Sequence, residues 1–149
     1  MSRKRFNGMH CPVAQSLDQI GDWWSLLIVR DAMRGMRRFG EFQASLGIAR
    51  NILADRLARL VEAKVLERRD VGRHGTHWEY RLAQKGRDLF PVIVALLQWG
   101  DRWIYGEGAS PAMVRERASG RPLAPLRVTD ADGRPLALRD VELILREDG

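Results

Sequence analysis

The spacing of hydrophobic residues predicts four helices within the first 63 residues. The first starts at Cys11-Pro12, because proline is favoured in a first helical turn, and ends at Gly21-Asp22. The others are expected over about residues 23–33, 39–46 and 50–63, with Gly47 permitting a sharp turn before the fourth. The fourth has an apolar face suited to a buried core, formed by Leu53, Leu57, Leu60 and Val61.

Two extended segments follow these helices and predict a hairpin. Residues 66–71 and 77–82 have strand character, and Trp78, Tyr80 and Leu82 alternate with charged residues as in a half-buried strand. The turn between the segments is basic and rich in glycine. Helix, tight turn, helix and basic hairpin are the elements of a winged helix-turn-helix, whose usual partner is double-stranded DNA.

A further helix is expected over about residues 84–105, with a kink near residues 87–91 caused by Pro91. It is apolar over more of its surface than a small domain requires. Packing against a partner helix explains this surplus, and burial in the chain's own core is the alternative.

The expected fold is therefore mainly α, with a small β-hairpin wing and a small C-terminal β appendage. Residues 1–10 are expected to be a flexible N-terminus, and residues 11–105 a winged helix-turn-helix with dimerisation helices. Residues 106–120, rich in glycine and proline, are expected to be a linker. Residues 121–149 predict a small β-hairpin module, because Asp132-Gly133 is a turn signal between short alternating segments.

Charge and composition narrow the class of function. The chain of 149 residues carries a net charge of +6, and residues 1–105 alone carry a net of +7 from 18 basic and 11 acidic residues. This excess would attract phosphates. The apolar runs are too short to span a membrane, and no secretory signal is evident. A single cysteine, Cys11, excludes an intramolecular disulfide and fits a reducing cytosol.

The outward face of the fourth helix supplies the candidates for reading bases. Arg50 and Asn51 lie in its first turn, and arginine pairs with guanine as asparagine does with adenine. Arg56 and Arg59 are interpreted as salt-bridged surface residues, and Asp55 as a partner of a neighbouring arginine. The complete set of predicted DNA-contacting residues is Arg37, Arg38, Arg50, Asn51, Ala54, Ala58, Arg73 and His74.

An ordered set of residues resembles the HxlR-type winged helix-turn-helix transcriptional regulators, relatives of the MarR group. The set comprises Cys11-Pro12-Val13, Ile20-Gly21, Trp24-Ser25-Leu26-Leu27-Ile28, Arg30, Gly35, Arg38-Phe39, Glu41-Phe42, Leu53, Arg56-Leu57, Leu60, Glu79-Tyr80, Leu82 and Lys85-Gly86. It covers residues 11 to about 103.

The resemblance implies a cytoplasmic homodimer that binds a palindromic operator, with repression as the expected action. The first helix and the helix after the wing would form the dimer. The expected interface residues are Val13, Leu17, Leu89, Ile93, Leu96, Trp99 and Trp103.

The chain departs from the family pattern at two helix starts. Ala49 stands where the family usually has serine, and Ala83 where it usually has threonine. Each change removes a side-chain cap worth about 1 kcal/mol. The loss at residue 49 also removes a hydroxyl suited to a phosphate contact.

Two routes for a signal are open. Cys11 matches the N-terminal cysteine that some family members use to sense oxidants or electrophiles, and the alternative is a small buried residue at the dimer interface. A small apolar effector is the other route, in a pocket lined by Trp23, Trp24, Trp99, Trp103 and Tyr105, although aromatic residues at helical spacing are more often core.

No cofactor, metal or enzymatic activity is expected. The C-terminal segment is similar to a tail that resembles a zinc ribbon in some family members, but it lacks cysteines. The three histidines show no metal or catalytic spacing. The alternative to a DNA-binding regulator is a winged-helix module that binds protein and lacks specific DNA binding.

Overall fold

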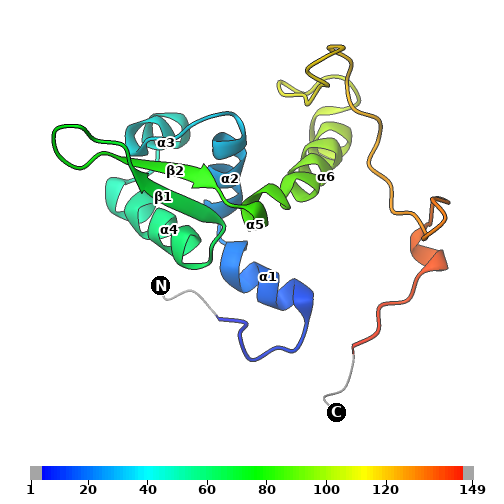
Figure 1. Ribbon diagram of the computed structural model, residues 1–149. Coiled ribbons are helices and arrows are strands. Elements are labelled where there is room, and N and C mark those ends of the chain that lie inside the picture. Colours follow the sequence, from blue (N-terminus) through cyan, green and yellow to red (C-terminus); the bar gives the residue numbers. More distant parts are fainter. Residues whose placement is uncertain (1–4, 146–149) are drawn as a thin grey trace. The chain divides into compact units, whose positions relative to one another are not determined.

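The computed structural model describes residues 5–145, and the chain divides into two compact units. The first unit is Met1–Phe90 and the second is Pro91–Gly149. We describe each unit by itself. Figure 1 labels the helices and strands along the chain.

The first unit contains the four predicted helices and the predicted hairpin. α3 (Phe39–Leu46) has the predicted bounds. α1 (Pro12–Ile20), α2 (Ser25–Met33) and α4 (Arg50–Glu62) differ from the prediction by no more than two residues at an end. β1 (Leu66–Asp70) and β2 (Trp78–Leu82) form an antiparallel pair with Leu66 opposite Leu82 and Asp70 opposite Trp78.

The core of this unit lies between α2, α3, α4 and the base of the hairpin. Leu53, Leu57 and Leu60 of α4 are fully buried, as their spacing predicted, whereas Val61 is half-buried. They share the core with Phe42 of α3 and with a group of other buried residues, Ile28, Val29, Val65 and Leu66. Full burial of one such side chain stabilises the fold by about 1.5–3 kcal/mol.

The turn between α3 and α4 depends on Gly47. Its φ of 61° is left-handed, a conformation that glycine adopts without steric cost. The Gly47 N–H donates to the Gln43 carbonyl at 2.9 Å, which closes the end of α3. Ile48 is then buried and α4 begins two residues later. The turn thus sets the angle between the two helices.

The predicted single helix over residues 84–105 is wrong, because three helical segments occupy this range. α5 (Gln84–Arg87) is a short turn, α6 (Phe90–Gly100) is a regular helix, and η1 (Asp101–Tyr105) is a wider π-helical turn. Pro91 has no N–H to donate, and its ring would clash with the Arg87 carbonyl in a continuous helix. The break between α5 and α6 therefore confirms the predicted kink.

The N-terminal residues 5–10 form a turn held against α1, and residues 1–4 lie outside the described range. The Arg5 guanidinium pairs with the Asp18 carboxylate at 2.9 Å, and the Phe6 N–H donates to it at 2.9 Å. Gln15 Nε2 donates to the Met9 carbonyl at 2.7 Å. Hydrogen bonds with the side chains of Asp18 and Gln15 in α1 thus hold residues 5–10, which were predicted to be flexible.

The predicted C-terminal strands are replaced by isolated bridges in the described part of the chain. Arg115 bridges Pro122, and Thr129 bridges Pro135 around the predicted turn at Asp132-Gly133. A short helical turn, η2 (Leu138–Asp140), follows. Each bridge is flanked by two backbone hydrogen bonds, among them Leu123 N–H to the Val114 carbonyl at 3.3 Å and Leu136 N–H to the Val128 carbonyl at 2.8 Å. The turn prediction is confirmed, but no strand forms within residues 106–145.

Candidate nucleic-acid interface

The outward face of α4 presents the predicted base-reading residues to solvent. Arg50, Asn51, Ala54 and Ala58 are all exposed, while the opposite face of α4 is buried. A helix with one face in the core and a small, polar face outward is suited to the major groove, which admits an α-helix.

Arg50 is held by an aromatic contact that the sequence did not reveal. Its guanidinium carbon lies 5.2 Å from the centre of the Phe39 ring, at the start of α3. A cation over an aromatic face at an exposed site contributes about 0.5–1 kcal/mol. The contact limits the side chain's motion and leaves the edge of the planar guanidinium available for hydrogen bonds.

Arg37 and Arg38 lie at the N-terminus of α3, where Glu41 binds their backbone. The N–H groups of Arg37 and Arg38 donate to Glu41 Oε2 at 2.7 and 3.0 Å. These two hydrogen bonds hold the pKa of Glu41 below its ordinary value. The Arg38 side chain is exposed, whereas Arg37 is half-buried with Nη1 3.5 Å from the Ala32 carbonyl. Arg38 is therefore the better placed of the two for a phosphate.

The wing turn is closed by Asp70, at the end of β1. Asp70 Oδ1 accepts the Gly72 N–H at 2.9 Å and the His77 N–H at 3.0 Å, and both bonds keep the pKa of Asp70 below its ordinary value. A Cβ at Gly72 would lie 1.9 Å from the Gly75 carbonyl oxygen, so this position accepts only glycine. Arg73 is thereby presented at the tip beside His74, and both are exposed.

The wing also carries a cation–π contact that the sequence did not single out. The Arg68 guanidinium carbon lies 3.9 Å from the centre of the Trp78 ring on the paired strand. The Tyr80 N–H of β2 donates to the Arg37 carbonyl at 2.7 Å, which ties the wing to the segment before α3. The hairpin thus lies beside α3 and α4 as one side of the same surface (Figure 1).

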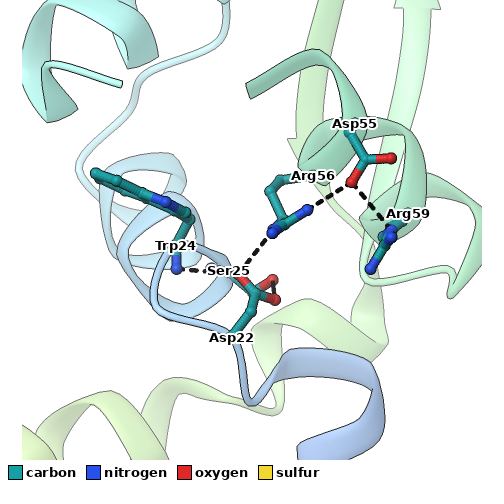
Figure 2. Close-up of polar contacts among 6 residues, drawn as sticks. All are labelled: Asp22, Trp24, Ser25, Asp55, Arg56 and Arg59. Atoms are coloured by element: carbon teal, nitrogen blue, oxygen red, sulfur yellow. Dashed lines mark hydrogen bonds and ion pairs between the residues drawn. The ribbon is translucent and has the colours of Figure 1, made fainter. Parts of the chain in front are cut away.

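Asp22 connects the start of α2 to α4 (Figure 2). Its Oδ1 accepts the N–H groups of Trp24 at 2.9 Å and Ser25 at 3.0 Å, and its Oδ2 accepts the Ser25 hydroxyl. Arg56 Nε of α4 donates to the same Oδ1 at 3.1 Å. The sequence indicated Asp22 only as a helix breaker, and nothing in its spacing signalled this cross-link.

The Asp22 carboxylate is charged in a nearly buried place. Burial disfavours its charged form, but hydrogen bonds from Ser25 and Trp24, with the charge of Arg56, more than offset this and lower the pKa of Asp22. Asp55 pairs with Arg56 at 2.5 Å and with Arg59 at 3.1 Å, as predicted. Figure 2 shows the chain of charges from α2 to the outer face of α4.

The N-termini of α4 and α5 both lack the side-chain cap that serine or threonine would give. Ala49 and Ala83 precede α4 and α5, and neither forms a capping hydrogen bond through its side chain. The first N–H groups of α4 therefore have no side-chain acceptor at the Ala49 position.

The predicted dimer residues are mostly exposed within the single chain. Val13 and Leu17 are exposed on α1, and Leu96, Trp99 and Trp103 on α6 and η1. Leu89 is half-buried. Ile93 is only 8% exposed, so the chain's own residues already cover it and it is poorly placed for an interface. Cys11 lies directly before α1 and is half-buried.

The aromatic residues expected to line an effector pocket do not line either of two surface cavities. Trp23 is 89% exposed, and Trp99, Trp103 and Tyr105 are also largely exposed. One cavity, of about 410 Å³, is in the second unit and is bounded by Val94, Leu97, Met113 and Leu123 among others. The other lies in the first unit and has a different lining.

Comparison with known proteins decides the family. The model of the HxlR-like helix-turn-helix matches residues 19–107, which contain α3, α4 and the wing. The chain belongs to the HxlR-like helix-turn-helix family. Relatives of this HxlR-like protein are named HTH-type transcriptional regulators.

Several HxlR-like relatives extend the match over most of the chain. An uncharacterised HTH-type transcriptional regulator of Mycobacterium tuberculosis, Rv3095, is 37% identical over 137 residues, covering 92% of this chain and 85% of the relative. PA1607, whose crystal structure is described as that of a candidate transcription factor, is 51% identical in sequence, with a TM-score of 0.83. The match covers 90% of this chain and 94% of the PA1607 chain.

A third relative is a redox regulator. The reduced form of HypR is 28% identical with a TM-score of 0.58, and the match covers 63% of this chain and 96% of HypR. HypR is also known in an oxidised form.

No helix within residues 5–145 of this chain is both long and apolar enough to cross a membrane.

Proposed function

We propose that this HxlR-like protein is a homodimeric repressor that binds a palindromic operator through α4. The proposal rests on the outward face of α4. Arg50 and Asn51 are exposed there, while the leucines on the opposite face of the helix are buried. Arginine and asparagine are the side chains that form bidentate pairs with guanine and adenine. Arg38 and the wing residues Arg73 and His74 would contact phosphates on either side.

Exposed apolar side chains support the dimer. Val13 is 59% exposed on α1, and Trp103 is 66% exposed on η1, with further exposed residues on α6. Large apolar side chains exposed on each of these helices favour association with a partner. Two identical subunits related by a twofold axis would address two half-sites about one helical turn apart, which is why the operator should be palindromic.

The test is binding to the DNA upstream of the protein's own coding sequence. We expect a footprint with two half-sites about 10 base pairs apart, and specific affinity at least about 1,000-fold above that for random duplex at physiological salt. Sedimentation of the free protein should give the mass of a dimer. Equal affinity for specific and random duplex at every salt concentration would exclude operator recognition and would favour a protein-binding winged helix.

Two arginine variants separate base reading from phosphate contact in the same assay. Arg50→Ala is expected to weaken operator binding about 10- to 100-fold and to relax the preference at one base position. Arg38→Ala should weaken all duplexes alike and reduce the salt slope by about one. Arg127→Ala, an exposed change of the same charge in the second unit, is the control and should alter neither property.

We further propose that oxidants or electrophiles release the DNA through Cys11. HypR supports this because it is a redox regulator of the same fold, and Cys11 is half-buried at the start of α1 rather than sealed in the core. As the only cysteine in the chain, it would form an adduct, a mixed disulfide or a bridge between subunits.

The Cys11 proposal predicts a difference between wild type and Cys11→Ser. Treatment with a thiol oxidant should lower the operator affinity of the wild type about tenfold or more, within the usual range of coupling between two sites. Cys11→Ser should bind equally before and after treatment, and a non-reducing gel would reveal any bridge. Equal release from both proteins would place the sensor elsewhere or remove it.

A further inference from the structure

The first unit contains an open cavity of about 440 Å³ with an unusual concentration of positive charge. Three arginines line it, Arg37 before α3, Arg81 on β2 and Arg87 at the end of α5. The remaining lining is apolar and consists of Ala32, Met33, Leu82 and Phe90. No acidic side chain is among the described residues that line it. The volume lies within the range of small-molecule sites, about 300–1,000 Å³.

The arginines of this cavity have more donors than the protein satisfies. Arg81 Nη2 pairs with Glu79 at 3.0 Å, but its Nε is buried and has no hydrogen-bond partner among the described residues. Within residues 5–145, neither Arg37 nor Arg87 forms an ion pair with a carboxylate. A buried N–H without an acceptor is rare in native proteins and indicates a missing partner.

We propose that this cavity binds a small organic carboxylate with an apolar body. The missing partner must be an acceptor, and the surplus of two positive charges favours an anion. A planar carboxylate matches the guanidinium fork, with one oxygen able to accept from Arg81 Nε. The apolar walls, above all Leu82 and Phe90, would cover the body of the ligand, which a free inorganic anion lacks.

The position of the cavity gives the ligand a regulatory role. Its arginines come from three segments, the link into the helix-turn-helix, the wing strand and the turn before α6 (Figure 1). A bound carboxylate would hold these segments together and would draw Arg37, a predicted phosphate contact, away from DNA. Ligand and operator binding are then negatively coupled, by equal factors in each direction. This consequence rests on the proposed function, but ligand binding itself does not.

The test uses calorimetry of the full chain without DNA, with benzoate as the probe. We expect one benzoate to bind per chain. Benzamide, which has the same ring but no charge, should bind at least about tenfold more weakly. Arg81→Gln and Arg87→Gln should each weaken benzoate binding about tenfold or more. Arg127→Gln, exposed in the second unit, removes the same charge and should bind benzoate as the wild type does.

Three outcomes would overturn the proposal. Benzoate binding that survives both Arg81→Gln and Arg87→Gln would place the ligand elsewhere. If inorganic phosphate binds as tightly as benzoate does, the apolar walls have no role in binding the ligand. If benzoate fails to bind while Arg87→Gln weakens specific and random duplex alike, the arginines contact the DNA backbone instead. Arg87 is exposed, so its variant tests the site even if Arg81→Gln disturbs the fold.

Discussion

Asp22→Ala is expected to lower the free energy of unfolding by about 3 kcal/mol, through the loss of the hydrogen bonds that its carboxylate accepts. The Asp22 carboxylate accepts two backbone N–H groups at the start of α2 and the Arg56 guanidinium of α4. Its side chain is only 7% exposed, so the solvent cannot replace these partners. Urea denaturation at pH 7 measures the change.

The same variant is expected to weaken operator binding, because Asp22 helps to fix α4, the proposed DNA-binding helix, to α2. Asp55→Ala is the matched control, since Asp55 also pairs with Arg56 but is half exposed to solvent. An exposed pair contributes about 0–1 kcal/mol, so Asp55→Ala should change stability little. Equal losses for the two variants would mean that the link between α2 and α4 has no special role.

The contribution of Asp22 should depend on pH in a definite direction. The pKa of Asp22 is lower in the folded protein than its ordinary value, so the folded state favours the charged form. Its contribution is then complete above the unfolded pKa of about 3.9 and is lost as the pH falls through the folded pKa. The difference in stability between wild type and Asp22→Ala should therefore be large at pH 7 and should shrink toward pH 3.

Gly86→Ala is expected to destabilise the first unit by about 3 kcal/mol, the upper range for overpacking a core. A Cβ at Gly86 would lie 2.2 Å from the Val65 carbonyl oxygen and 2.9 Å from Leu82 Cδ2. The Val65 carbonyl cannot move freely, because it accepts the Ala83 N–H at 3.1 Å. The substitution must therefore push α5 away from the base of the wing.

Gly40→Ala provides a control of opposite sign. Gly40 also lies in a helix, α3, but a Cβ there would have no heavy atom within 4 Å. Alanine should stabilise this position by about 0.5–1 kcal/mol, because it restricts the unfolded chain and favours the helix. Thermal unfolding of both variants would show the contrast, and equal stability of Gly86→Ala and wild type would refute the packing argument.

The sequence predicted the first unit well because its local and long-range signals agree. Each of three local signals indicates one structure: the leucine spacing of α4 a helix, the glycine at residue 47 a turn, and the alternation of the second wing segment a strand. The segment after the wing was harder: Pro91 indicated the kink, but the apolar helical pattern did not show that three separate helical segments form there. In the C-terminal segment, short alternating segments predicted a β-hairpin, but only isolated bridges form within residues 106–145.

The site was predicted in its exposed residues and missed in its connections. The solvent exposure of Arg50 and Asn51 follows from helix periodicity, which can be read from a single sequence. The Asp22–Arg56 bond joins residues 34 positions apart, and the Arg50–Phe39 contact depends on the angle between two helices. The arginines of the cavity, Arg37, Arg81 and Arg87, come from three separate segments, so only the fold brings them together.

The bare start of α4 has a thermodynamic consequence for the regulator. With Ala49 in place of a capping residue, the first N–H groups of α4 have no side-chain acceptor at that position. A backbone phosphate of DNA is a natural acceptor for those N–H groups. If α4 binds an operator as proposed, a phosphate would supply the acceptor that residue 49 lacks, and DNA binding would complete the cap of this helix.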